Sequence, residues 1–214
     1  MKKLKIIFSH KIFHIFTWVF LSLLGAFIVL TIFRFFNYFE VEKINNLVSK
    51  IHSNKISIND VMGDNLPIDP GIANDKTIIG IDSNKNGIRD DVEIAIFKEY
   101  PNSAKTRAVL LQYALALQMQ MTQPFIDTTI ATEVVREQSR ASTCLSDEIS
   151  PRKDPESSRD DIGMEKIYTY INFVENKQFN TEERRNDRDV FFKNVRSYSD
   201  LEDGCDIDLT KLPN

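Results

Sequence analysis

The longest apolar stretch of the chain lies close to its start. From Ile12 to Phe33 almost every residue is apolar, and this run of 22 residues carries no Asp, Glu, Lys or Arg. At about 1.5 Å per residue, such a helix is about as long as the 30 Å hydrocarbon core of a bilayer is thick. We therefore predict a transmembrane helix, bounded as residues 12–36, that contacts the lipid bilayer.

A cleaved secretory signal is the alternative interpretation of this segment. Such a signal has a shorter apolar region, followed by small residues at a cleavage site. Here the apolar run is followed by the bulky residues Arg34 to Phe39, and only the stretch Ser22 to Ala26 favours cleavage. We expect an uncleaved signal anchor.

The distribution of basic residues around the anchor predicts its orientation. Four lysines lie in the short segment 1–11, whereas Arg34, Lys43 and Lys50 follow the apolar run. Because the more basic flank stays in the cytoplasm, we expect segment 1–11 to be cytoplasmic. The rest of the chain is then periplasmic or extracellular, on a protein that crosses the inner (cell) membrane once.

Residues 37–80 are predicted to form a juxtamembrane helix and a linker. Val41, Ile44, Val48 and Ile51 recur at steps of three and four residues, which is the spacing of one helix face. From Ser53 to Gly80 the chain contains prolines, glycines, Asn and Asp, which break regular structure.

Residues 81–214 show a helical pattern, and the fold class we predict is mostly α. The second of the predicted helices has apolar residues on several sides, so we expect it to be the buried centre of an extracytoplasmic helical domain. Phe191, Val195 and Tyr198 are expected on the apolar face of the last helix, and residues 146–159 are expected to be a loop. The predicted helices cover residues 91–100, 103–123, 128–145 and 160–177, and a last one begins after Asn180 or Thr181.

Composition fits a globular domain and limits its partners. The chain is 42% hydrophobic and 27% charged, which excludes a disordered or collagen-like protein. Residues 40–214 hold 22 of the 27 basic side chains and all 31 acidic ones. This acidity argues against nucleic acid as a partner, because phosphate binding needs a basic face.

Two cysteines, Cys144 and Cys205, fall in the part that is predicted to be exported. An oxidising compartment favours a disulfide between them, and neither belongs to the Cys-x-x-Cys pattern of redox enzymes. Two unpaired thiols remain the alternative, because the sequence does not show whether the two Cα atoms come within about 7 Å.

The segment 82–93 carries the most specific chemical pattern of the chain. Oxygen-bearing side chains stand at its positions one, three, five, nine and twelve, and a glycine, Gly87, stands at position six. Calcium takes six to eight oxygen ligands, and a short loop supplies them only when it coils tightly around the ion. The pattern predicts a Ca²⁺ site whose ligands are Asp82, Asn84, Asn86, the carbonyl of Ile88, Asp90 and Glu93.

This segment resembles an EF-hand-type calcium loop, and its Asp-x-Asn-x-Asn-Gly-x-x-Asp form is similar to dockerin and thrombospondin-type loops. The resemblance covers twelve residues and implies a single structural calcium site. No helical pattern enters the loop, no second loop exists to pair with it, and Arg89 stands where paired EF-hands have an aliphatic residue. The alternative is an Asn- and Asp-rich turn before an acidic helix start.

The sequence offers little material for catalysis. The three histidines, His10, His14 and His52, all precede the predicted helical domain, and no glycine-rich phosphate loop is present. We therefore predict no catalytic residue, and we expect a non-enzymatic binding or scaffolding module of the cell envelope with an envelope protein as partner. The alternatives are an inhibitor or immunity-type protein against an exported toxin, and a carboxylate-dependent cell-wall hydrolase.

Overall fold

A computed structural model describes residues 2–124, 126–154, 157–201 and 204–213, with side chains from Phe13 onward. No strand occurs among these residues, so the predicted mostly α fold is confirmed. The chain forms two compact units, Met1–Asn46 and Leu47–Asn214. The helices are α1 (Lys2–Ser53), α2 (Ile58–Met62), the 3-10 helix η1 (Gly71–Lys76), α3 (Asp90–Glu99), α4 (Ala104–Thr122), α5 (Thr128–Ile149), α6 (Asp161–Gln178), α7 (Glu182–Phe192) and the 3-10 helix η2 (Leu209–Lys211).

The first unit consists of the greater part of α1. Its side chains from Phe13 to Phe39 are exposed, and most of them are apolar. Within the described part of the chain, α1 is the one helix long and apolar enough to cross a membrane, which fits a single-pass membrane protein. The helix continues without a break from the predicted anchor into the predicted juxtamembrane helix and ends at Ser53.

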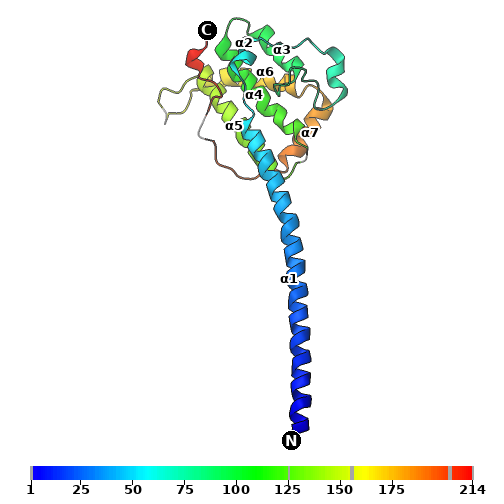
Figure 1. Ribbon diagram of the computed structural model, residues 1–214. Helices are drawn as coiled ribbons and strands as arrows, with labels where there is room; N and C mark the ends of the chain where they lie inside the picture. The colour runs from blue at the N-terminus through cyan, green and yellow to red at the C-terminus, as the bar shows by residue number, and fades with distance from the viewer. Residues whose placement is uncertain (1, 125, 155–156, 202–203, 214) are drawn as a thin grey trace. The chain divides into compact units, whose positions relative to one another are not determined.

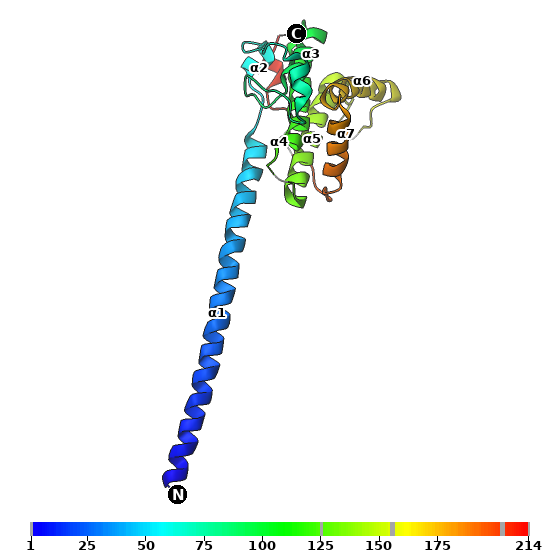
Figure 2. The same cartoon turned by 90° about the vertical axis from the view of Figure 1, so that its right-hand side faces the viewer.

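The second unit is built around α4. Every residue of this helix from Arg107 to Met121 is buried, as the apolar residues on its several sides predict. Helices α3, α5, α6 and α7 all contact α4, which lies in the middle of the unit (Figure 1). Figure 2 shows α2 on one side of α4 and α6 on the other. Because α4 has no exposed face, its packing determines where the surrounding segments lie.

Three residues of α4, spaced by three, contact distant segments of the chain. Gln112 donates a hydrogen bond to the carbonyl of Gly204 at 2.8 Å. Gln118 donates to the carbonyl of Ile79 at 2.8 Å. Leu115 lies between them and packs against Gly87, since a Cβ at that glycine would lie 2.6 Å from Leu115 Cδ1.

The segment that was predicted to be a linker is part of the second unit and contains two short helices, α2 and η1. Ile56 and Val61 are buried, so this segment contributes to the core. Helix α2 begins with a capping box between Ser57 and Asp60 and ends at Gly63, whose φ is 79°. Its five residues are too few to show a hydrophobic period, which is why the sequence pattern missed it.

Two predicted helix ends were wrong. Helix α5 continues to Ile149, so the loop expected at 146–159 begins later. Helix α7 ends at Phe192, and Val195 and Tyr198 lie beyond it, with Tyr198 43% exposed. The spacing of Val195 and Tyr198 matched a helix. After Phe192, however, the hydrogen bonds join residues three apart instead of four, as from Asn194 N to the carbonyl of Phe191 at 3.0 Å.

Candidate metal centre

The predicted calcium loop, residues 82–93, follows η1 and runs into the first turn of α3, and its backbone before α3 is tightly coiled. Lys85 and Gly87 have φ values of 60° and 88°, in the left-handed region that glycine adopts without strain. The loop is closed at its end by a hydrogen bond from Asp90 N to the carbonyl of Ile81, at 2.8 Å. Arg89, the residue before α3, has an extended backbone and no capping side chain. The loop therefore leads directly into the first turn of α3, where Glu93 lies.

Four predicted ligand side chains, Asp82, Asn84, Asn86 and Asp90, hold the coil together. Each uses one oxygen to accept a hydrogen bond from a backbone N–H within the loop. The bonds run from Gly87 N to Asp82 Oδ2 at 2.9 Å, from Asn86 N to Asn84 Oδ1 at 3.3 Å, from Ile88 N to Asn86 Oδ1 at 2.9 Å and from Ser83 N to Asp90 Oδ1 at 2.9 Å. The structure thus gathers these four side chains around one short turn of backbone.

The carboxylates of the loop are withdrawn from water. Asp90 and Glu93 are each 1% exposed. Burial raises the pKa of Glu93 to about 7, although Asn84 donates a hydrogen bond to its Oε2 at 3.0 Å. Burial also raises the pKa of Asp82, whose Oδ1 is buried and has no hydrogen-bond partner. Such a set of buried oxygens is costly unless a cation compensates it.

The donor set fits a hard cation better than a transition metal. Within the described residues, no three or more His, Cys, Asp and Glu side chains are arranged as a metal-binding group, and Asp82, Asp90 and Glu93 are no exception. The predicted ligands include two amides and a backbone carbonyl besides the three carboxylates, so all of the donors are oxygens. Calcium accepts this mixture of oxygens and tolerates irregular geometry. The buried Oδ1 of Asp82, which has no hydrogen-bond partner, is an oxygen available to bind a cation.

A cavity beside the loop gives solvent a route to it. This cavity has a volume of about 690 Å³ and is lined on one side by Asp82, Lys85 and Gly87. The last turns of α1 and the end of α4 line the rest, with Lys50, Met119 and Gln123 among others. An entry path of this kind is one requirement for a metal site.

Arg89, at position eight of the loop, is fully buried. Its guanidinium donates to the carbonyls of Gln178 at 2.9 Å and Lys177 at 2.5 Å, at the end of α6. It also forms an ion pair with Asp91 at 2.6 Å. Arg89 thus anchors the loop to the end of α6.

A second polar cluster lies between α1 and α5, and the sequence pattern missed it. His52 Nδ1 lies 2.6 Å from Glu137 Oε1, and His52 Nε2 lies 2.9 Å from Glu133 Oε2. The expectation that no histidine belongs to the helical domain was wrong, because the end of α1 packs in the second unit. No sequence signal joins His52 to two carboxylates about 80 residues away.

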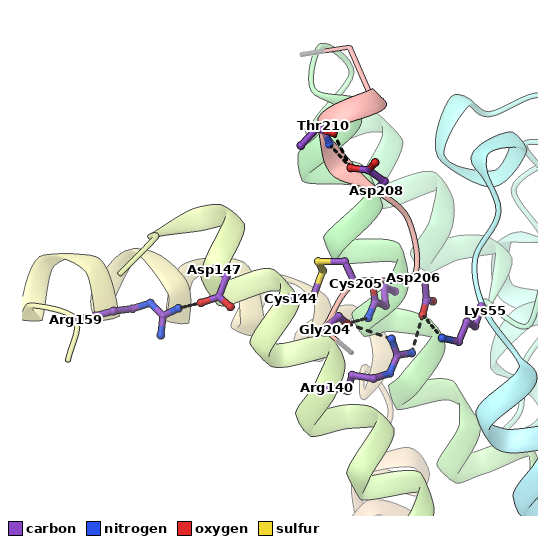
Figure 3. Close-up of a disulfide and its surroundings, with 11 residues drawn as sticks. Lys55, Arg140, Cys144, Asp147, Arg159, Gly204, Cys205, Asp206, Asp208 and Thr210 are labelled. Atoms are coloured by element: carbon purple, nitrogen blue, oxygen red, sulfur yellow. Dashed lines mark hydrogen bonds and ion pairs between the residues drawn. A yellow bond between two sulfur atoms is a disulfide. The ribbon is translucent and has the colours of Figure 1, made fainter. Parts of the chain in front are cut away.

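The predicted disulfide is confirmed. Cys144 and Cys205 are bonded, with their Cα atoms 5.0 Å apart. Figure 3 shows that the bond fastens the C-terminal segment next to Arg140 of α5. Arg140 pairs with Asp206 at 2.6 Å and with Glu137 at 2.7 Å, and all three side chains are almost fully buried. Asp206 also accepts a hydrogen bond from Ile56 N at 3.2 Å.

Comparison with protein-family models, with curated proteins and with solved structures finds no match to this chain.

Proposed function

We propose that residues 82–93 bind one calcium ion through Asp82, Asn84, Asn86, the Ile88 carbonyl, Asp90 and Glu93. The observation that carries the proposal is the buried Oδ1 of Asp82, which has no partner in a loop whose backbone amides order the neighbouring oxygens. A carboxylate oxygen removed from water is stabilised when a cation meets it. Calcium is the cation that takes six to eight such oxygens.

Calcium in this loop would fix the start of α3 against the segment before it. With three carboxylates among the ligands, we expect an affinity like that of extracellular modules, with a dissociation constant on the order of 10⁻⁴ to 10⁻³ M. Such a site is filled where calcium is always present and is unsuited to sensing cytoplasmic signals. This affinity agrees with a domain on the outer side of the membrane, which the four lysines before the anchor also favour.

We propose the whole protein as a membrane-anchored, non-enzymatic binding or scaffolding module of the cell envelope. An exposed apolar groove supports a protein partner. It has a volume of about 410 Å³ and is lined by Met62, Leu66, Ile94, Phe97 and Pro101, among others. Met62 and Leu66 are 44% and 41% exposed, and clustered apolar side chains of this kind are typical of interaction surfaces.

The test is calorimetric titration of CaCl₂ into the full chain in detergent micelles, after removal of metal with a chelator. We expect saturable binding of one ion and a rise in thermal midpoint. Asp82→Ala and Glu93→Gln should each weaken binding by at least tenfold, because each removes a charged ligand.

The matched control is Glu99→Gln, which changes an exposed glutamate on the same helix as Glu93. This variant should bind calcium like the unmodified chain. Absence of binding at several millimolar calcium would refute the site, and so would equal affinities in Glu93→Gln and Glu99→Gln.

A further inference from the structure

The segment from Ser57 to Leu66, which contains α2, packs beside the calcium loop. Within its capping box, Asp60 Oδ2 accepts hydrogen bonds from Ser57 N and from Ser57 Oγ, both at 2.7 Å. These two bonds fix the carboxylate of Asp60 in one orientation and leave its other oxygen, Oδ1, available.

The Oδ1 atom of Asp60 contacts the calcium loop at Asn86. It accepts a hydrogen bond from Asn86 Nδ2 at 3.4 Å. The carbonyl of Asn65 accepts a similar bond from Asn84 Nδ2 at 3.1 Å. The two amide oxygens face the coil, because Asn84 Oδ1 accepts from Asn86 N and Asn86 Oδ1 accepts from Ile88 N, while Asn84 Nδ2 also donates to Glu93 Oε2 at 3.0 Å.

We infer that Asp60 is a positioning residue of the calcium site: by accepting from the Asn86 amide, it turns the Asn86 oxygen toward the ion. This inference rests on the proposed calcium binding. Groups that orient a ligand without touching the metal typically change affinity by ten- to a hundredfold. Helix α2 would then supply the outer support that a second loop supplies in a paired EF-hand.

The contacts of residue 60 require a carboxylate at this position. Asp60 must accept from Ser57 with one oxygen and from Asn86 with the other, and only a carboxylate has two acceptor ends. In Asp60→Asn, the amide oxygen keeps the two short bonds to Ser57, and the new NH₂ faces the NH₂ of Asn86. The Asn86 amide must then turn, which points a donor at the cation.

The experiment compares variants of the full chain in detergent micelles by calcium calorimetry. Asp60→Asn should weaken calcium binding about tenfold while leaving the thermal midpoint in chelator nearly unchanged. Asp64→Asn is the matched control, because Asp64 is an exposed aspartate in the same segment. It should leave the affinity unchanged. The double variant Asp60→Asn/Asn86→Asp keeps the net charge and reverses donor and acceptor across the contact, so it should restore most of the lost affinity.

Terbium bound in place of calcium separates positioning from direct ligation. Its luminescence lifetimes in H₂O and D₂O count the waters on the ion, and this count should be the same in Asp60→Asn and in the unmodified chain. An added water would make Asp60 a ligand and overturn the positioning role.

Equal affinities in Asp60→Asn and Asp64→Asn, or a double variant as weak as the single one, would also overturn the positioning role. If the unmodified chain binds no calcium, or Glu93→Gln binds like it, the calcium site itself fails instead.

Discussion

The two sides of the Leu47–Asn214 unit are stabilised in opposite ways. On the disulfide side, the buried carboxylates of Glu137 and Asp206 both pair with Arg140, and a covalent bond holds the segment in place. On the loop side, Asp82, Asp90 and Glu93 accept from backbone and amide N–H groups, and no basic side chain among the described residues donates a hydrogen bond to them. One side contains its own countercharge, and the other is the side to which we assign the proposed calcium ion. This difference predicts that removing the disulfide lowers stability without changing the proposed calcium binding.

Removing the disulfide should have the largest effect. The bond joins residues 61 positions apart, and a loop of that length corresponds to about 4 kcal/mol in the chain-entropy model. We expect Cys144→Ala/Cys205→Ala to lower the free energy of unfolding by about that amount, measured by denaturant titration. Calcium affinity of the folded double variant should stay the same. A loss of calcium binding at temperatures where this variant is folded would contradict the separation of the two sides.

The pH dependence of stability should identify the loop side. Burial raises the pKa of Glu93 to about 7, from an ordinary value of 4.5, so the folded chain keeps a proton that the unfolded chain releases. Without calcium, stability should therefore fall as pH rises from about 4.5 to 7, by an amount on the order of 2 kcal/mol.

Denaturant titrations at pH 5.5 and pH 8, in chelator and in saturating calcium, measure this effect. Calcium should remove the fall because it compensates the ionised carboxylate. Glu93→Gln is the control and should lose this part of the pH dependence. An unchanged dependence in that variant would assign the effect to other groups.

Gly87→Ala should have the smallest of these effects on stability. The new Cβ would meet Leu115 Cδ1 at 2.6 Å, and a φ of 88° is unfavourable for alanine. We expect a loss of about 1–2 kcal/mol, measured by denaturant titration, together with weaker calcium binding. Gly71→Ala is a useful comparison, because Gly71 has a φ of 55° but open space around it. If both variants bind calcium equally well, the tight coil at Gly87 is not required.

The sequence predicts the longer helices α3 to α7 because each shows an apolar pattern, a cap or both. Ser103, Asp127, Asp160 and Thr181 each accept a hydrogen bond from the first turn of their helices, as residues of these types commonly do. The coil of residues 82–93 also agrees with the pattern, because Gly87 and the Asn and Asp side chains act locally. Whether calcium occupies it stays a prediction.

The surroundings of the loop could not be predicted from the sequence. Arg89 binds backbone carbonyls at the end of α6, and any sequence provides carbonyls there. Asp60 contacts Asn86 from a helix of five residues that shows no period. These contacts join segments that are far apart along the chain. No spacing of residue types in the sequence predicts such contacts.

Helix α4 contacts both sides of the Leu47–Asn214 unit. Gln112 holds the C-terminal segment, Leu115 packs against Gly87, and Gln118 holds the carbonyl of Ile79 just before the loop. These three attachment points lie within six residues, or about 9 Å along the helix axis. A shift of α4 by one turn would therefore displace the C-terminal segment and the segment from Ile79 to Gly87 together.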